Sequence, residues 1–177
     1  LLEKFAAGYK AGAEAAGEDL GKPITVQVQW IGTGNETFSS PDRAQVIAQS
    51  MIDQGADVLY HAAGGSGNGM FNACAANGAA CIGVDSDQYE SFAAQPDVQK
   101  TIITSMVKRV DNAVFDYASG IIDGSITGGE TLTGDLENEG VGYSTSNPDL
   151  SQDDIAYMDG WQEQIIAGDV EIPTTLS

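Results

Sequence analysis

Two carboxylates stand two residues apart in the segment GVDSDQ, where Asp85 and Asp87 follow the apolar run AACIGV. Carboxylates at the end of a buried strand are good acceptors for sugar hydroxyls, because a hydrogen bond to a charged group is stronger than a neutral one. A solvated acidic turn is the alternative in so acidic a chain. A metal site is not predicted, because this segment brings no neighbouring histidine, cysteine or further acid.

A glycine-rich loop occupies the stretch HAAGGSGNGMF, residues 61–71. Glycine at this density after a strand indicates a backbone that comes close to a ligand, often a phosphate. The dinucleotide fingerprint GxGxxG fails here at its last position, and no Gly-Lys-Ser/Thr follows as a Walker A loop requires, although Asp85 lies where a ribose-binding acid would fall. We interpret the loop as a close-approach turn for a neutral ligand, with a purely structural strand-to-helix turn as the alternative.

A lysine, a histidine and two aromatic rings complete the candidates. Lys108 is expected one turn into a helix after the strand TIITS, where it either pairs with Asp85 or contacts a ligand. His61 stands alone, and a histidine at a buried strand end is more often hydrogen-bonded in the core than catalytic. Trp30 and Phe38 flank the first loop and serve either in packing or as platforms for a planar ring. We expect no catalytic residue, metal ligand or cofactor.

The two cysteines, Cys74 and Cys81, are seven residues apart. The first falls in a helix-like segment and the second opens a strand. They are either two small buried thiols or a disulfide that closes a short loop in an extracytoplasmic protein. Spacing alone leaves both possibilities open, because it does not show whether the sulfurs meet.

The composition disfavours two classes of binding partner, nucleic acids and anionic membranes. The chain has 177 residues, 42% of them hydrophobic, and 26 acids against 7 bases give a net charge of -19. Such a surface repels nucleic acid and anionic membranes. The acids are scattered through apolar periodicity, which favours a folded domain with an acidic face and a halophilic source. The sequence shows no signal-peptide or transmembrane run, and its first residues read as the inside of a helix, so we expect part of a longer protein.

Hydrophobic periodicity predicts helices and strands in alternation. The predicted helices cover residues 5–16, 70–76, 106–122 and 152–167, together with one that starts at Pro41; Ser40 and Ser151 are the expected N-caps. The predicted strands cover residues 24–30, 55–61, 79–85 and 99–105, and a short pair covers 130–135 and 139–144. A stripe on the helix at 106–122 is assigned to the core, namely Val107, Val110, Val114 and Tyr117. This alternation is typical of an α/β fold with a doubly wound parallel sheet.

In doubly wound sheets, ligands bind outside the carboxyl ends of the strands. The strand ends here carry Trp30, His61, Asp85 and the pair Thr104 and Ser105. Because the carboxyl ends of parallel strands share one edge, these polar and aromatic side chains are expected to line one rim. The pattern predicts a ligand pocket at that rim.

Four segments together resemble the basic membrane protein family: FAAGYKAGA, DQGADVLYHAAGGSGNGMF, IGVDSDQ and ITSMVKRVDNAVFD. Its members, the purine nucleoside receptor among them, are extracytoplasmic lipoproteins that serve as substrate-binding components of ABC transporters for nucleosides. The resemblance runs from Phe5 to about Val141. It implies a binding protein rather than an enzyme.

The family has the two-lobed type I periplasmic-binding-protein fold, with the ligand held between the lobes. The resemblance implies that residues 1–103 form the second-lobe α/β domain. Residues 104–130 would form a crossover helix that packs on the first lobe, and residues 131–177 the return strands and the C-terminal helix. The first lobe and the lipid-anchor cysteine lie outside this sequence.

The residues that the resemblance assigns to ligand contact are Trp30, Phe38, Gly64, Gly65, Asp85 and Lys108. Phe38 matches a stacking aromatic, with Trp30 as the alternative because the loop GTGNETFSSPD is longer than usual. The backbone of Gly64 and Gly65 would meet the ligand. Asp85 would accept ribose hydroxyls, and Lys108 would reach the nucleoside.

The function that follows is nucleoside binding, with a purine favoured, for an ABC importer. Its partners would be the nucleoside and the transporter permease, with no nucleic acid and with the membrane reached only through a lipid anchor at the cell surface. Two alternatives stay open from the residues. One is a nucleotide-using α/β enzyme domain that holds a ribose on Asp85, and the other is a ligand-sensing regulatory domain of the same fold.

Overall fold

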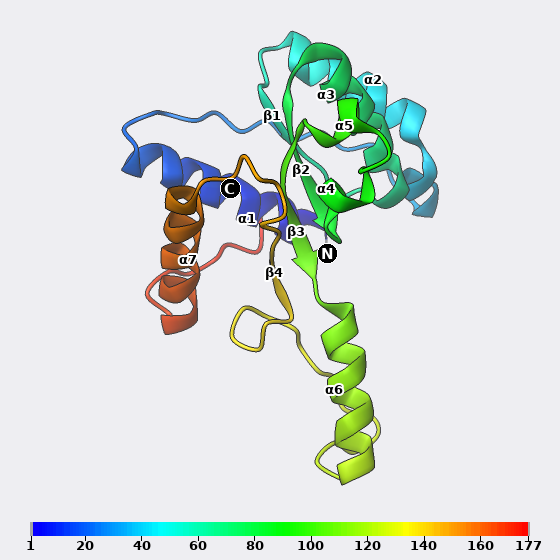
Figure 1. Cartoon of the computed structure of the whole chain (residues 1–177), viewed down its shortest axis with the longest axis vertical. Coiled ribbons are helices and arrows are strands. Elements are labelled where there is room, and N and C mark those ends of the chain that lie inside the picture. Colours follow the sequence, from blue (N-terminus) through cyan, green and yellow to red (C-terminus); the bar gives the residue numbers. More distant parts are fainter. Residues whose placement is uncertain (1, 177) are drawn as a thin grey trace.

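The computed structural model describes residues 2–176. Figure 1 shows a parallel sheet with helices around its upper part and one helix that extends away below it. The elements in chain order are α1 (Leu2–Asp19), η1 (Asn35–Ser39), α2 (Pro41–Asp53), β1 (Val58–Tyr60), η2 (Gly64–Ser66), α3 (Gly67–Asn77), β2 (Ala80–Asp85), α4 (Gln88–Ser91), α5 (Pro96–Gln99), β3 (Ile102–Lys108), α6 (Val110–Asp123), β4 (Val141–Tyr143) and α7 (Gln152–Ala167).

The sheet has the order β1-β2-β3-β4. The first three strands run parallel, with Leu59 opposite Cys81 and Asp85 opposite Val107. β4 pairs antiparallel with the end of β3. Short apolar strands joined through helices form this arrangement because each crossover returns the next strand in the same direction.

Helices cover both faces of the parallel strands. Leu59 on β1 packs into a core with helices α2, α3 and α5. The next side chain along a strand points to the opposite face, and there the ring of Tyr60 stacks on Tyr9 of α1, with the ring centroids 5.0 Å apart. α1 therefore lies across the sheet from α2 and α3, as a doubly wound fold requires. α7 lies beside α1: the Tyr157 hydroxyl of α7 donates to the Asp19 carboxylate at the end of α1, at 3.0 Å.

The core lies between α3 and the centre of the sheet. Phe71 and Cys74 of α3 are fully buried against Cys81 of β2 and Ile102 of β3. Burial of a Phe or Ile side chain contributes about 1.5–3 kcal/mol. This buried layer holds α3 against the sheet and so sets the positions of the loops that follow β1 and β2.

The predicted strand at residues 24–30 is wrong in one respect. Within the described residues 2–176 this segment is extended but joins no strand ladder. The predicted alternation of apolar and polar residues is still visible in their exposure, since Val26 and Val28 are half-buried while Thr25 and Gln27 are exposed. The pattern correctly indicated an extended segment with one inward face, but the ladder also needs an adjacent strand edge.

The predicted helix at 106–122 begins later than expected. β3 continues through Lys108, and α6 starts at Val110. The stripe assigned to the core is also wrong for this chain: Val110 and Val114 are 62% and 64% exposed, and Tyr117 is 39% exposed. Figure 1 shows why, because α6 extends away from the sheet below β3. Its apolar face therefore has little of this chain to pack against.

Two further expectations differ from the structure. Residues 130–135 form no strand among the described residues, and β4 at 141–143 pairs with β3 instead. Ser40 precedes α2, but its hydroxyl donates to the Glu36 carbonyl at 2.7 Å rather than capping the helix.

Other predictions hold closely. α7 spans the predicted residues, and Ser151 forms a reciprocal capping box with Asp154. The helices α1 and α3 each begin three residues before the predicted start.

The close contact between α2 and α3 generates a test at Gly69. A Cβ built there would collide with the Pro41 carbonyl oxygen, so Gly69→Ala is expected to cost about 1–3 kcal/mol by overpacking. Gly12→Ala is the matched control, because that helical position has open space and alanine there is expected to stabilise by about 0.5–1 kcal/mol. Urea unfolding of both variants measures the difference. Equal effects would contradict the close approach of the two helices.

Candidate functional site

The candidate site is the rim at the carboxyl ends of β1, β2 and β3. Asp85 ends β2, and Lys108 ends β3. The two strands are paired in register with Asp85 opposite Val107, so the two side chains come from adjacent strands although 23 residues separate them in the sequence. The parallel pairing alone brings the acid and the base together.

Asp85 and Lys108 form an ion pair at this rim. The Lys108 Nζ lies 2.7 Å from Asp85 Oδ1, and the two side chains are 38% and 52% exposed. The same ammonium lies 4.8 Å from the ring centroid of Phe5 on α1, a cation–π contact. Pairs this exposed contribute little to stability, typically below about 1 kcal/mol. Both charges are therefore within reach of a solute that arrives at the rim.

The backbone of Asp85 has an uncommon conformation. Its φ is +70°, in the left-handed region that a non-glycine residue rarely adopts. Aspartate and asparagine tolerate this region better than most side chains, because their short polar groups bond locally. The turn directs the chain from β2 into α4, which Asp87 caps by accepting from the Glu90 amide at 3.3 Å. The second carboxylate of GVDSDQ is thus a helix cap.

The glycine loop packs against Phe38. A Cβ at Gly64 would meet the Phe38 ring at 3.4 Å, and one at Gly65 would meet the Phe38 carbonyl at 3.2 Å. The Ser66 hydroxyl joins the same two loops, since it donates to the Thr37 carbonyl at 2.5 Å and accepts from the Ser40 amide at 2.7 Å. The structure therefore brings Phe38 and the glycine loop together as one surface.

Two of the four glycines are required by packing alone. A Cβ at Gly67 would overlap the His61 imidazole, and one at Gly69 would overlap the Pro41 carbonyl. The purely structural interpretation therefore accounts for the second half of the loop. Gly64, with a φ of +52°, and Gly65 remain available for contact with a ligand.

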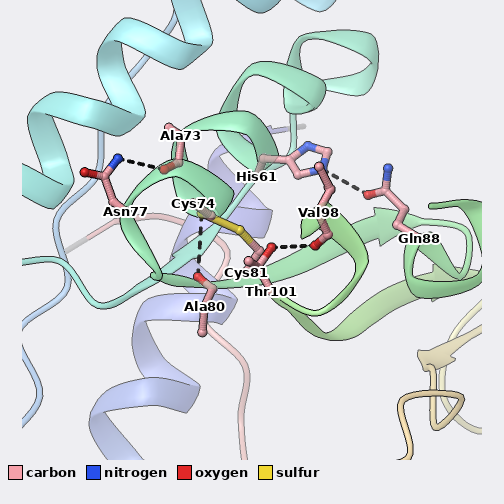
Figure 2. The surroundings of a disulfide bond; sticks show 9 residues. All are labelled: His61, Ala73, Cys74, Asn77, Ala80, Cys81, Gln88, Val98 and Thr101. Atoms are coloured by element: carbon pink, nitrogen blue, oxygen red, sulfur yellow. Dashed lines mark hydrogen bonds between the residues drawn. A yellow bond between two sulfur atoms is a disulfide. The ribbon is translucent and has the colours of Figure 1, made fainter. Parts of the chain in front are cut away.

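His61 is held in a buried hydrogen-bond network. Its Nε2 lies 3.0 Å from Gln88 Oε1, and that oxygen also accepts from the Val84 amide at 2.7 Å. The Ala63 amide approaches Nδ1 at 3.4 Å, so Nε2 donates and Nδ1 accepts in a neutral ring. Burial lowers the pKa of His61 from its ordinary value, against the smaller opposing effect of the Gln88 hydrogen bond. Figure 2 shows the imidazole directed toward Gln88. This is the geometry of a structural core histidine.

Tyr60 connects the rim to α1. Burial raises the pKa of its phenol well above the ordinary value, and the charge of Asp85 and the neighbouring Tyr9 act in the same direction. The hydroxyl therefore stays protonated and available as a donor at neutral pH. Sequence reasoning passed over Tyr60, although its place at the end of the strand DVLY was a usable signal.

The two cysteines are joined as a disulfide between α3 and β2. Their Cα atoms are 6.7 Å apart, and both side chains are fully buried. Figure 2 shows the bond beneath the helix, with the Asn77 amide donating to the Ala73 carbonyl nearby. The bond ties the glycine-rich helix to the strand that ends in Asp85.

The six predicted contact residues fall into two groups. Asp85 and Lys108 are directly paired, while Phe38 contacts Gly64 and Gly65. The sixth residue, Trp30, is 51% exposed and lines one cavity with Phe38. His61 and Tyr60 also line that cavity and feel the charge of Asp85, so they lie between the groups.

The position of Lys108 differs from expectation, because it ends a strand instead of lying in a helix. The ion pair with Asp85 is one of the two alternatives that the sequence left open. Gln88 was not predicted. Ser105 was expected at the strand end on the rim, but β3 continues to Lys108 and Ser105 is fully buried within it, where its Oγ accepts from the Gln88 backbone amide at 3.1 Å. Such bonds cross 17 residues of sequence, and no local pattern signals them.

Two classes of site find no support in residues 2–176. No group of three or more histidine, cysteine or acidic side chains in that range is arranged to hold a metal ion. No helix in the same range has both the length and the apolar character needed to cross a bilayer. The interactions that the structure does show at the rim are hydrogen bonds, an ion pair and aromatic contacts.

Comparison with known proteins gives consistent matches. Residues 1–175 match the family described as Bmp: ABC transporter substrate-binding protein PnrA-like. A CD4+ T-cell-stimulating antigen of Listeria monocytogenes is 32% identical over 98% of this chain and 49% of its own length. The ABC transporter nucleoside-binding protein BmpA of Lactococcus lactis is 32% identical over 83% of this chain and 43% of its own length.

A solved structure also matches. The ABC transporter system solute-binding protein from Aeropyrum pernix K1 has a TM-score of 0.72 and 26% identity, over 99% of this chain and 55% of its own chain. The predicted α/β fold of the periplasmic binding proteins is thereby confirmed. The chain spans about half the length of the curated relatives that it matches.

The buried neutral histidine generates a pH test. His61 is the chain's one histidine, and its pKa is lowered in the folded state from 6.5. The unfolded state therefore binds more protons as the pH falls through about 6.5, and the free energy of unfolding falls with it. His61→Gln keeps a donor for Gln88 but does not titrate. Urea unfolding between about pH 7.5 and 5.5 should show a shallower slope for the variant. Identical slopes would contradict a neutral buried ring.

The disulfide generates a stability test. Loss of a bond that closes a short loop is expected to cost about 2–4 kcal/mol. A double variant, Cys74→Ala with Cys81→Ala, avoids a lone thiol, and its unfolding midpoint should match that of the reduced wild type. Reductant should leave the double variant unchanged. A wild type whose midpoint does not respond to reductant, and whose mass shows two free thiols, would contradict the bond.

Proposed function

Because this chain belongs to the family of PnrA-like ABC transporter substrate-binding proteins, we propose that it forms one side of a nucleoside-binding site in a solute receptor. The family resemblance carried by the sequence motifs is confirmed by this match. The family is one of binding proteins, not enzymes. Recognition of a solute at the rim, without chemical change, is therefore the activity that we assign.

The observation that carries the proposal is the Asp85–Lys108 pair at the end of adjacent strands. A carboxylate accepts hydrogen bonds from a sugar diol, and such charge-assisted bonds are stronger than neutral ones. Lys108 adds a donor beside it. The pair therefore supplies both kinds of partner that a ribose needs.

The aromatic residues supply the second half of the recognition. Phe38 is 39% exposed and Trp30 is 51% exposed, and both line the cavity that runs to the rim. A planar base fits against such rings. Phe38 is the stronger platform, because the glycine loop fixes it, and the backbone of Gly64 and Gly65 lies beside it.

The charge of the chain favours a nucleoside over a nucleotide. A net charge of -19 opposes the approach of phosphate groups. The relative from Lactococcus lactis is described as a nucleoside-binding protein, which supports the same class of ligand. The preference for a purine rests on the family resemblance.

The remainder of the receptor follows from the same proposal. Residues 1–103 would be the second lobe, 104–130 the crossover and 131–177 the return segment, with the ligand between this lobe and a first lobe. The exposed apolar face of α6, with Val114 and Phe115 at 64% and 71% exposure, suits packing against that first lobe. Hinge closure around the ligand would then present the receptor to its permease.

Two properties of the whole protein belong to the proposal. An extracytoplasmic location on a lipid anchor follows from the family, because two relatives, from Pyrococcus abyssi and Pyrococcus horikoshii, carry the name lipoprotein. A buried disulfide suits that oxidising location. The chain has 26 acidic residues against 7 basic ones, and this imbalance supports a halophilic source, because hydrated carboxylates keep a protein surface soluble at high salt.

The test is calorimetry of the longer protein in high salt against guanosine, adenosine, inosine and uridine. Asp85→Asn keeps a side chain that tolerates the left-handed backbone but loses the charge. It is expected to weaken nucleoside binding by about 1.5–3 kcal/mol, roughly 10- to 100-fold.

Asp97→Asn is the matched control, because Asp97 also pairs with a lysine at 2.7 Å but in an exposed pair between α5 and its C-cap residue Lys100. Its affinity should equal that of the wild type. Unchanged affinity in Asp85→Asn would mean that Asp85 lies in a solvated acidic turn and does not bind the ligand. Absence of heat with every nucleoside would reject the nucleoside class itself.

A further inference from the structure

Phe5, near the start of α1, lies against the ammonium group of the candidate site. Its ring centroid is 4.8 Å from Lys108 Nζ, within the roughly 6 Å over which the face of an aromatic ring attracts a cation. Figure 1 shows α1 beginning near the carboxyl end of β3, where Lys108 is the last residue. The Phe5 ring is half-buried and lines the same cavity as Phe38 and Trp30. This contact therefore joins α1 to the rim.

Lys108 is held both from the sheet and from the helix. Asp85 Oδ1 lies 2.7 Å from the ammonium, and the Phe5 ring is its second contact. Lysine carries its charge on a long flexible stem, and ordering that stem costs conformational entropy. A half-exposed ion pair contributes little on its own. The position of the ammonium therefore depends on the ring as well as on the carboxylate.

A second aromatic contact fixes α1 beside the strand ends. Tyr9 lies four residues after Phe5, so the two rings share one face of the helix. The Tyr9 ring stacks on that of Tyr60 in β1, with the ring centroids 5.0 Å apart. Burial raises the pKa of Tyr60, and the charge of Asp85 adds to this effect, so the stack lies close enough to sense the carboxylate. One face of α1 thus packs against the ends of β1 and β3.

We propose that Phe5 is a positioning residue of the candidate site: its ring holds the Lys108 ammonium at the rim and through it sets the affinity for the solute. This inference rests on the proposed function, in which a sugar diol donates hydrogen bonds to Asp85. When the diol occupies the carboxylate, the ammonium gives up part of its ion pair, and the Phe5 ring is the partner that it keeps. The lysine is then already in place to donate to the solute.

Two other roles for Phe5 lead to different results. A ring that only packs α1 against the sheet would change stability without changing the environment of Lys108. A ring that touches the solute itself would act on affinity whether or not the lysine is present. Phe5→Leu separates these roles, because leucine keeps an apolar side chain but has no π face. Phe5→Tyr is the conservative variant, because it keeps that face.

The position of the ammonium can be measured in the longer protein without a ligand. Reductive methylation with isotope-labelled formaldehyde turns each lysine into a dimethylammonium that keeps its charge, and nuclear magnetic resonance then reports each methyl signal. The reference is Lys100, whose ammonium pairs with Asp97 at the same 2.7 Å and contacts no aromatic ring within residues 2–176. A group above a ring face is shielded, so the Lys108 signal should lie upfield of the Lys100 signal.

The variants make this measurement specific. Phe5→Leu should remove the upfield shift of Lys108 and leave Lys100 unchanged, whereas Phe5→Tyr should retain the shift. A Lys108 signal at the Lys100 position in the wild type would overturn the proposal, and this result needs no variant to fold.

Calorimetry then shows whether the contact reaches the solute, with guanosine, adenosine, inosine and uridine as probes. Phe5→Leu is expected to weaken nucleoside binding about 2- to 5-fold, the size of an exposed cation–π contact, and Phe5→Tyr should bind as the wild type does. In a Lys108→Met background, which keeps an apolar stem without the charge, Phe5→Leu should have no effect.

An equal loss in both backgrounds would overturn the proposal, because Phe5 would then act without the lysine. Absence of binding with every nucleoside would reject the proposed function and with it the effect on affinity. The methyl signal would still decide whether Phe5 holds Lys108, so the two failures are distinguishable.

Discussion

Three strands that run in the same direction determine where every group of the candidate site stands. Parallel pairing brings the carboxyl ends of β1, β2 and β3 to one edge, so His61, Asp85 and Lys108 become neighbours across 47 residues of sequence. The strands use their own backbone groups in the ladder. The side chains at the strand ends and in the loops that follow remain free for a ligand, and the polar groups lie there.

The rim is rigid because buried hydrogen bonds tie its loops to one another. Gln88 accepts from both His61 and the Val84 amide, which joins the loop after β1 to the loop after β2. Ser66 joins the glycine loop to the segment that carries Phe38. These bonds are satisfied inside the protein, where an unpaired polar group would be costly. The glycine loop is therefore shaped as much by packing as by any ligand it meets.

Local patterns predicted the elements better than the contacts between them. The capping signal at Ser151 and the apolar period after it predicted α7 to its last residue. The run TIITSMVK was ambiguous, because a short apolar segment fits a strand or a helix equally well, and so Lys108 was placed on the wrong element. Whether residues 24–30 join a ladder and which residue partners His61 depend on segments far away in the chain. No window of sequence contains that information.

The Asp85–Lys108 ion pair has a kinetic consequence for the proposed site. Its carboxylate and ammonium lie 2.7 Å apart, so under the proposal a diol would exchange partners with the ammonium on the carboxylate instead of displacing a full shell of water. The two states would then differ by the modest energy of a half-exposed pair. On departure of the solute the lysine would return to the carboxylate, and no unpaired charge would be left behind. A receptor that works in this way would give up some strength of binding for faster release, because the lysine that helps to hold the solute would also lower the barrier to its departure.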